Sequence, residues 1–308
     1  MNNDNINVNE MDYNINNVLD LEISSILNRS KQLERDILVL SGGSSKGIAQ
    51  IGAIHCLQKH GIIKTIRTIA GTSAGSIVGM MYCAGYQPIE MYKFFSLLDV
   101  TSVTKLDAVN MITTFGLNDG KRMVLVLKKL LTAKGFDENI VFKDFYRKTN
   151  IKYIVTGTCV NDKQIKYFSY ETYPNMKIID AVRISISIPV FFTPVIFEGK
   201  TYVDGACIDN FPIHLFKNEQ ERVIGIYVTE MRENVEEIKY IDTYLTNVIE
   251  CIMESMSYRE VANYSNIIFI RCTKPGETPA DFASMFDQGY METKNKIDMG
   301  VFTQKNKL

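Results

Sequence analysis

The sequence predicts an α/β fold of three layers, with helices on both faces of a mostly parallel central sheet. Short apolar runs of strand type alternate with longer stretches whose apolar residues recur at helical spacing. Glycines follow several of these runs, as expected where a strand turns into a helix. Because 46% of the residues are apolar, the chain can bury a large core, and wholesale disorder is excluded.

The N-terminal half contains two strand–helix pairs. The first helix carries Ile48, Ile51 and Ile54 at helical spacing, and Gly61 is a plausible stop. Small residues along this helix allow it to approach a sheet closely. The expected elements are a strand at 36–43, a helix at 46–61, a strand at 65–71 and a helix at 73–85.

The remainder continues the alternation and adds two antiparallel pairs of strands. Residues 161–163 (NDK) separate the first pair, and a short hairpin surrounds residues 198–206. The other expected elements are helices at 88–99, 119–135, 176–187, 236–263 and from about 281, and strands at 152–160, 164–170, 222–228 and 267–272. Neither an internal repeat nor a clear linker divides this region.

The N-terminus differs in composition from the rest. Eight of the first seventeen residues are Asn, so we expect residues 1–18 to be a disordered lead and residues 19–308 to form a single domain. Residues 18–35 could form an amphipathic helix docking on that domain. The lead has neither a basic region nor an apolar core of signal-peptide type, and no apolar run is long enough to span a bilayer. We expect an intracellular protein, cytoplasmic or peripheral at membranes.

Charge and cysteine content exclude several classes of function. The net charge is −1 without a basic stripe, which argues against a nucleic-acid partner. The six cysteines lie far apart without a C-x-x-C pair, which argues against a zinc site and a disulfide framework. We expect reduced thiols, no metal and no cofactor.

Ser73 is the first candidate for chemistry, in the segment GTSAG between a predicted strand and helix. In a G-x-S-x-G turn the central side chain is exposed, and the flanking glycines avoid a backbone clash. The helix that follows directs its N–H groups toward the turn, which favours a developing oxyanion. A purely structural turn of small residues remains an alternative. The segment consists of Gly71, Thr72, Ser73, Ala74 and Gly75.

A second glycine-rich turn, SGGSSKG at residues 41–47, also lies between a strand and a helix. Its backbone can present N–H groups to an anion. The spacing fits neither nucleotide fingerprint, because G-x-G-x-x-G is absent and Gly47 is followed by Ile48 instead of the Lys-Ser/Thr pair. Two anion-binding turns, one of which carries the candidate nucleophile Ser73, suggest a split acyl-transfer site.

A nucleophilic serine needs a base, and the sequence offers two candidates. Asp204 ends a short strand in TYVDGACIDNFPI, where Gly205 and Ala206 turn the chain away. His214 completes the order Ser…Asp…His of the α/β-hydrolases, although only ten residues separate it from Asp204. Both a dyad with Asp204 and a triad that uses His214 stay open on these residues alone.

These segments together resemble the patatin-like phospholipases in content, order and spacing. SGGSSKG, GTSAG, SISIPVFFTPV and VDGACIDNFP occur in the family's order between residues 36 and 228, with FGLNDGKRMVLVLKKLL between nucleophile and aspartate. The resemblance implies a Ser–Asp dyad without histidine, in which Ser73 attacks an ester carbonyl and Asp204 accepts its proton.

The resemblance also implies an oxyanion hole in the first turn. Backbone N–H groups of Gly43 and Ser44 would hold the oxyanion, with Lys46 nearby; Gly42 and Gly47 complete this loop. The family commonly has a third glycine where this chain has Ser44, and serine tolerates positive φ poorly. We expect this departure to affect the rate of the reaction or the range of substrates more than the reaction class.

The implied substrate is a phospholipid or another ester lipid, met through transient peripheral contact with a membrane. The apolar segment IPVFFTPVIF and the Met- and aromatic-rich helices suit ester lipids, and these helices could line an acyl channel or touch a membrane surface. A core role for each single residue is the alternative. Homodimerisation is left open. The competing interpretations are a triad-type esterase that uses His214 and a catalytically inactive lipid-binding module on the same fold.

Overall fold

The computed structural model describes residues 35–97, 115–230, 264–273 and 278–302, together with a few single positions between 238 and 251. By its internal contacts the chain divides into residues 1–34 and residues 35–308, and the described residues belong to the second unit. The expected lead at 1–18 and nearly all of the expected helices at 18–35 and 236–263 lie outside the described residues.

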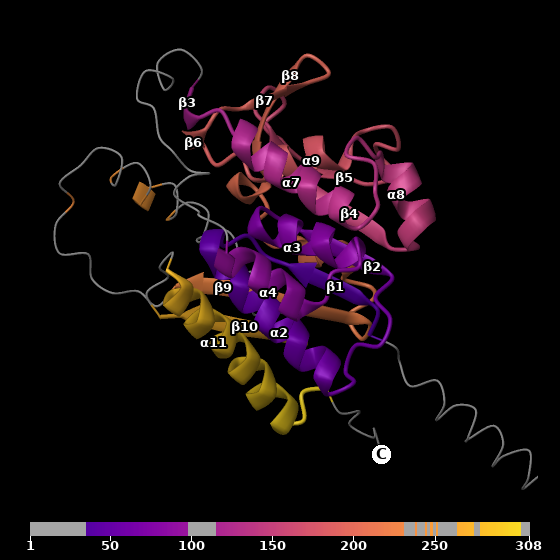
Figure 1. The fold of residues 1–308 in the computed structure, drawn as a ribbon, viewed down its shortest axis with the longest axis vertical. Coiled ribbons are helices and arrows are strands. Elements are labelled where there is room, and N and C mark those ends of the chain that lie inside the picture. Colours follow the sequence, from indigo (N-terminus) through magenta and orange to yellow (C-terminus); the bar gives the residue numbers. More distant parts are fainter. Residues whose placement is uncertain are drawn as a thin grey trace, which may run out of the picture. The chain divides into compact units, whose positions relative to one another are not determined.

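An eight-stranded sheet forms the centre of the described region (Figure 1). Its strand order is β10-β9-β1-β2-β4-β8-β7, and β5 pairs with β4 off this path. The strands are β1 (Ile37–Leu40), β2 (Thr68–Gly71), β4 (Lys152–Cys159), β5 (Gln164–Phe168), β7 (Val195–Phe197), β8 (Lys200–Asp204), β9 (Val223–Glu230) and β10 (Ile267–Cys272).

The sheet is mostly parallel. Strands β10, β9, β1, β2 and β4 run parallel to one another, whereas β5, β8 and β7 join through antiparallel pairings. The register pairs Leu40 with Gly71, so β1 and β2 end side by side at one edge of the sheet. The predicted α/β class with a mostly parallel sheet and helices on both faces is confirmed.

Alternate residues of the strands belong to different parts of the core, as the two-residue period of a strand requires. In β1, Leu38 and Leu40 pack into the large cluster formed with the helices of one face. Ile37 and Val39 instead pack into a smaller cluster with residues of the short helix η3 (Pro212–Phe216). All four side chains are almost fully buried, which explains why β1 has no polar–apolar alternation in the sequence.

The helices follow the predicted order, and most of them pack on the face that carries the larger core cluster. They are α2 (Gly47–Lys59), α3 (Ala74–Cys83), α4 (Pro88–Leu97), α7 (Lys121–Ala133), α8 (Phe142–Thr149), α9 (Ile178–Ser185) and α11 (Pro279–Asp298), with short 3-10 turns η1 (Ser44–Lys46) and η2 (Gly205–Cys207). Within the described residues, none of the helices combines the length and the apolar character needed to cross a bilayer.

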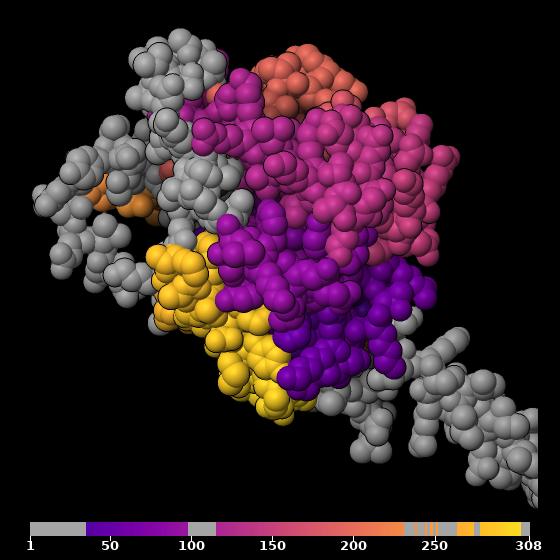
Figure 2. Space-filling model, in the orientation of Figure 1, coloured from indigo at the N-terminus to yellow at the C-terminus, as the bar shows by residue number. Residues whose placement is uncertain are grey.

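Helices α2 and α11 are in unusually close contact, although they come from opposite ends of the described chain (Figure 1). A Cβ atom on Gly52 would lie 2.0 Å from the Phe286 carbonyl oxygen, and one on Gly289 would lie 1.9 Å from the Ala49 carbonyl oxygen. Only glycine fits at both positions. Figure 2 shows the C-terminal segment in yellow against the indigo N-terminal segment.

Three elements were not expected from the sequence: the strands β3 (Gly116–Asn118) and β6 (Val190–Phe192) and the helix α8. Strands β3 and β6 form a small parallel sheet of their own beside the main one. Helix α8 follows an extended residue, Val141, and ends at Asn150 in the left-handed region.

Candidate active site

The two glycine-rich turns meet at the edge of the sheet where β1 and β2 end. A Cβ atom on Gly75 would lie 2.6 Å from the Ser41 carbonyl oxygen and 2.7 Å from that of Leu40. A Cβ atom on Gly47 would lie 3.1 Å from the Cβ of Ala74. The glycines at these positions allow the turns to come into direct backbone contact, so the two segments form one structural unit.

Ser73 occupies the position between β2 and α3 in a conformation that non-glycine residues rarely adopt. Its φ is 51° and its ψ is −121°, and only 5% of its surface is exposed. Such a backbone conformation costs about 1–3 kcal/mol and persists only where the surroundings enforce it. The Ser73 N–H donates to the Ser185 hydroxyl at 2.9 Å, and the Ser73 carbonyl accepts from the Ser76 hydroxyl at 2.6 Å.

The turn after β1 is held from several sides. The Gln50 side chain donates to the Ser41 carbonyl at 2.7 Å, and the Val228 N–H donates to the Ser41 hydroxyl at 3.0 Å. Within the described residues, the backbone N–H groups of Gly43 and Ser44 donate no hydrogen bond. Ser44 has a φ of 51°, the left-handed conformation in which glycine is preferred.

Gly42 and Gly205 allow further close contacts around the site. The Gly42 N–H donates to the Asn210 carbonyl at 3.1 Å, and a Cβ atom on Gly42 would lie 2.3 Å from Asn210 Oδ1. A Cβ atom on Gly205 would lie 2.1 Å from Thr156 Oγ1. Both glycines therefore let neighbouring segments pack against the turn and against the end of β8.

Asp204 is the last residue of β8 and is completely buried. Its Oδ1 accepts from the Ala206 N–H at 2.8 Å, and its own N–H donates to the Ser187 carbonyl at 2.9 Å. Burial raises the pKa of Asp204 to about 7, while hydrogen bonding with the Ala206 N–H and then with the Ser73 hydroxyl acts to lower this pKa.

The structure therefore brings Ser73 and Asp204 together, although they are far apart in the sequence. Among the described residues, Asp204 Oδ2 has no partner that meets strict hydrogen-bond geometry. The Ser73 hydroxyl is nonetheless close enough to lower the pKa of the carboxyl group. We infer that the two side chains are adjacent without a fully formed hydrogen bond, a common arrangement of catalytic groups before substrate binds.

His214, the alternative base, lies in a different cluster. Its Nδ1 is 3.7 Å from Asp209 Oδ2, and its Nε2 is 3.2 Å from the Tyr167 hydroxyl, which donates to the same carboxylate at 2.8 Å. The Asp209 carbonyl in turn accepts from the Thr72 hydroxyl at 3.2 Å. The Thr72 hydroxyl, next to Ser73 in the sequence, therefore contacts the backbone of this cluster.

Lys46 lies at the end of the first turn, where its ammonium group is 3.5 Å from the Glu230 carboxylate at the end of β9. Its side chain is mostly buried, with 13% exposed. The described residues that line the pocket beside Ser73 do not include Lys46. As to metals, no group of three or more His, Cys, Asp or Glu side chains among the described residues could hold an ion.

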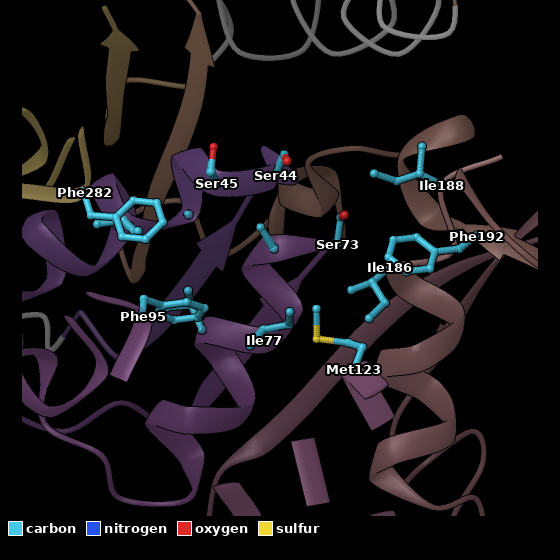
Figure 3. A pocket seen from close by; sticks show the side chains of 14 residues that line it. Ser44, Ser45, Ser73, Ile77, Phe95, Met123, Ile186, Ile188, Phe192 and Phe282 are labelled. Carbon is cyan, nitrogen blue, oxygen red and sulfur yellow. The ribbon is translucent and has the colours of Figure 1, made fainter. Parts of the chain in front are cut away.

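A largely apolar pocket of about 160 Å³ opens beside Ser73 (Figure 3). In this view the Ser73 side chain points into the space between the turn that bears Ser44 and Ser45 and the wall that contains Ile188 and Phe192. The apolar lining is formed by Ile48, Ala74, Ile77, Val78, Phe95, Met123, Ile186, Ile188, Phe192 and Phe282.

Several of these residues were not identified individually from the sequence, although an acyl channel lined by Met- and aromatic-rich helices was expected. Phe95 comes from α4, Met123 from α7 and Phe282 from α11, and each has the helical spacing of an ordinary core residue. Ser185, which accepts the Ser73 N–H, lies on α9 within an apolar stretch. The serine in that stretch was the one available signal, because a fully buried hydroxyl requires a hydrogen-bond partner.

Comparisons with solved structures agree with this architecture. VipD from Legionella pneumophila aligns with a TM-score of 0.56 and 19% identity over 86% of this chain and 67% of that one. The type III effector ExoU aligns with a TM-score of 0.51 and 15% identity over 87% of this chain and 53% of that one. At these sequence identities, the two similarities show a common fold.

Sequence comparisons identify the family. A probable lipid hydrolase of Invertebrate iridescent virus 6 is 31% identical over 58% of this chain and 62% of its own length. An uncharacterized Bacillus subtilis protein, YqhO, is 30% identical over 75% of this chain and 86% of its own length. Lysophospholipase NTE1 of Candida albicans is 30% identical over 58% of this chain and 12% of its own length. The match thus spans less than two thirds of the viral relative. The family model of the patatin-like phospholipases matches residues 38–217, and the chain belongs to that family.

Proposed function

We propose that the protein is a lipid acyl hydrolase of phospholipase A type that uses Ser73 as nucleophile and Asp204 as general base. The observation that carries this proposal is the contact between a strained serine and a buried carboxylate beside an apolar pocket. Membership of the patatin-like phospholipases supports a lipid hydrolase activity.

The first half of the reaction forms an acyl-enzyme. The Ser73 oxygen bonds to the ester carbonyl carbon while its proton moves to Asp204. The carbonyl oxygen becomes an oxyanion, which the N–H groups of Gly43 and Ser44 stabilise because they have no other acceptor among the described residues. The tetrahedral intermediate then expels the alcohol, which takes the proton from Asp204.

In the second half of the reaction, a water molecule hydrolyses the acyl-enzyme with the help of the same groups. Asp204 accepts a proton from a water molecule, whose oxygen attacks the acyl carbon. The new intermediate breaks the bond to Ser73, which recovers its proton from Asp204, and a fatty acid leaves. A carboxyl group with a pKa of about 7 can both accept and release this proton near neutral pH.

The other predicted residues serve this arrangement in our proposal. Gly71, Ala74 and Gly75 let the elbow form, and Gly42 and Gly47 let the oxyanion loop lie against it. The ion pair with Glu230 anchors Lys46 at the end of that loop. Lys46 therefore contributes positive charge near the turn and does not bond to the oxyanion directly.

The pocket supports an acyl chain as the group next to the ester. A cavity of about 160 Å³ resembles in size an apolar engineered cavity of roughly 150 Å³ that stays dry and binds benzene. It can therefore hold the first part of a single hydrocarbon chain. Phospholipids and lysophospholipids carry such chains, and transient contact with a membrane surface would supply them.

Two substitutions test the dyad. Ser73→Ala and Asp204→Asn should each reduce the hydrolysis of a phospholipid in detergent micelles by roughly 10⁴-fold or more, because each removes a member of the acylation step. Circular dichroism and the unfolding midpoint confirm that each variant is folded. Retention of full activity by either variant would refute the proposal.

His214→Ala is the matched control and also tests the triad. Because the His214 imidazole lies against Asp209 and Tyr167, its loss should change kcat by less than roughly fivefold. A loss as large as that of Ser73→Ala would favour the triad. If native protein binds lipid but neither hydrolyses it nor reacts with a fluorophosphonate at Ser73, it is a non-catalytic lipid-binding module.

A further inference from the structure

The last turn of α9 and the residues directly after it contact both members of the proposed dyad. The Ser185 hydroxyl accepts from the Ser73 N–H at 2.9 Å, and the Ser187 carbonyl accepts from the Asp204 N–H at 2.9 Å. We propose that this turn aligns the nucleophile with its base and that Ser185 is the positioning residue for Ser73. The inference rests on the proposed function.

Ser185 supplies an acceptor that the backbone cannot provide. Strand β2 ends at Gly71, so the N–H of Ser73 has left the sheet, and α3 begins only at Ala74. A buried N–H without a partner costs about 1–3 kcal/mol. The Ser185 side chain is completely buried and directed at this N–H from a distant part of the sequence. It therefore stabilises Ser73 in its positive-φ conformation.

The turn is itself held rigidly. The Ser187 hydroxyl donates to the Arg183 carbonyl at 2.6 Å and accepts from the Arg183 guanidinium at 2.5 Å. The same guanidinium donates to the Thr193 carbonyl at 3.0 Å and to the Asp119 carbonyl at 3.2 Å. Arg183 is buried, so these bonds replace water around its charge.

Neighbouring residues of the segment reach the pocket. Ile186 and Ile188 line it from the side facing Ser73 (Figure 3). One short segment thus carries a contact with the nucleophile, a contact with the base and part of the acyl-chain wall. Misplacing a catalytic group by about 1 Å can cost roughly 100-fold in rate. A shift of this turn would change the relative position of the Ser73 oxygen and the Asp204 carboxylate.

Ser185→Ala tests the proposal with a phospholipid substrate in micelles. We expect kcat to fall roughly 10- to 100-fold and KM to change less than about twofold, because the pocket wall is retained. The rate of labelling by a fluorophosphonate should fall by the same factor as kcat. A kcat equal to that of the native enzyme would overturn the proposal.

The pH profile gives a second readout that a general loss of stability would not produce. The Ser73 hydroxyl lowers the pKa of Asp204, so moving it away should shift the acid limb of the kcat profile to higher pH. The other groups acting on the carboxyl are the Ala206 N–H and the thiol of Cys207, whose pKa is raised to about 12, so that it stays neutral. An unshifted limb together with a native kcat would refute alignment by Ser185.

Ser76→Ala is the matched control, because it is also a fully buried serine hydrogen-bonded to the Ser73 backbone. Its hydroxyl donates to the Ser73 carbonyl, which keeps the backbone bonds from the N–H groups of Ser76 and Ile77. We expect it to change kcat less than about threefold. Equal losses in Ser76→Ala and Ser185→Ala would show that the effect is general packing, and would overturn the proposal.

A second variant covers the case in which Ser185→Ala does not fold. Ser185→Cys keeps the shape of the side chain with a weaker acceptor, and should lower kcat roughly three- to tenfold. A native kcat in this variant would also overturn the role of Ser185. Ser73→Ala separates the proposed function from the proposed alignment by Ser185. If Ser73→Ala retains hydrolysis, the proposed function fails. If Ser73→Ala is inactive while the Ser185 variants have native activity, only the alignment by Ser185 fails.

Discussion

The two turns that form the candidate site share a serine at positive φ but present different groups to it. Each follows one of two adjacent parallel strands, and each places a serine at φ 51°, Ser44 in the first and Ser73 in the second. Ser73 is buried and its side chain enters the site, whereas Ser44 is exposed and the groups next to the site are backbone N–H groups. One turn therefore presents a side chain to the site, and the other presents main-chain donors.

This difference explains where each turn tolerates change. In the second turn the proposed function requires the serine side chain, and glycines flank it because neighbouring backbone leaves no room for a Cβ atom. In the first turn any residue that reaches φ 51° can present its N–H. Ser44, where patatin-like sequences commonly have glycine, thus stands at a position where the proposed function uses the backbone N–H and no side chain.

The contact between the turns gives the largest expected effect. Gly75→Ala places a Cβ atom against two backbone carbonyls, at 2.6 and 2.7 Å, which cannot rotate away. We expect the free energy of unfolding to fall by about 3 kcal/mol or more in urea titration, with loss of activity.

Gly79→Ala on the same helix is the control for this substitution. Its Cβ atom would meet side chains of Ile69 and Tyr153 at 2.9 and 3.1 Å, and side chains can adjust. Its loss of stability should be clearly smaller. Equal losses would contradict the view that backbone contact between the turns is the specific requirement.

Titration of Asp204, the proposed base, tests the turn that bears Ser73. The pKa of Asp204 is about 7, and only its charged form accepts a proton, so kcat should fall about tenfold for each pH unit below this value. A flat profile from pH 5 to 8 would exclude Asp204 as the base.

Stability should change in the opposite direction over the same range. Burial raises the pKa of Asp204 from 3.8 to about 7 in the folded state, so the folded protein binds more protons than the unfolded chain between these values. This group therefore lowers the free energy of unfolding as pH rises from about 4 to 7. Asp204→Asn should remove that contribution. In urea titrations at pH 8 the variant should therefore be more stable than the native protein.

The first turn should respond moderately to a change at Gly42. A Cβ atom there would lie 2.3 Å from Asn210 Oδ1 and 3.2 Å from the Cβ of Ser73. We expect Gly42→Ala to lower the free energy of unfolding by about 1–3 kcal/mol. Adding Asn210→Ala makes room for the new methyl group and should recover part of the lost stability. A double variant no more stable than Gly42→Ala would show that contact with the Asn210 side chain is not the cause of the loss.

The smallest effect is expected at Ser44. Ser44→Gly relieves a positive φ but gives the unfolded chain more freedom, so stability should change by less than about 1 kcal/mol and kcat by less than about threefold. Ser44→Ala keeps the N–H and the strain and serves as the control. A loss of kcat in Ser44→Ala comparable to that of Ser73→Ala would refute the division of roles between the two turns.

The sequence predicted those parts of the fold that depend on local signals. Strands β1 and β2 are short apolar runs followed by glycine, and α2 and α3 follow them at once, so periodicity and turn chemistry were sufficient. A short hairpin around residues 198–206 was also predicted. In the structure its strands are β7 and β8, and Glu198 and Gly199 in its turn both have a positive φ.

Other parts depend on contacts that local signals do not carry. Strands β3 and β6 have three residues each, and Val190 in β6 has a φ of 74°, which is rare for a β-branched residue. The spacing of Asp204 and His214 could not distinguish a dyad from a triad, because the choice depends on which side chain the sheet brings beside Ser73. Ser185 was unrecognised for the same reason.

The close contact between α2 and α11 has a practical consequence for experiments on shortened forms of this protein. The family match ends at residue 217, yet α11 lies beyond it and supplies Phe282 to the pocket wall. An expression fragment trimmed to the region of sequence similarity would expose the face of α2 around Gly52 on which α11 packs, and would remove Phe282 from the wall of the pocket. Activity assays on such a fragment would then measure the damage caused by trimming, and the boundary should follow the helix.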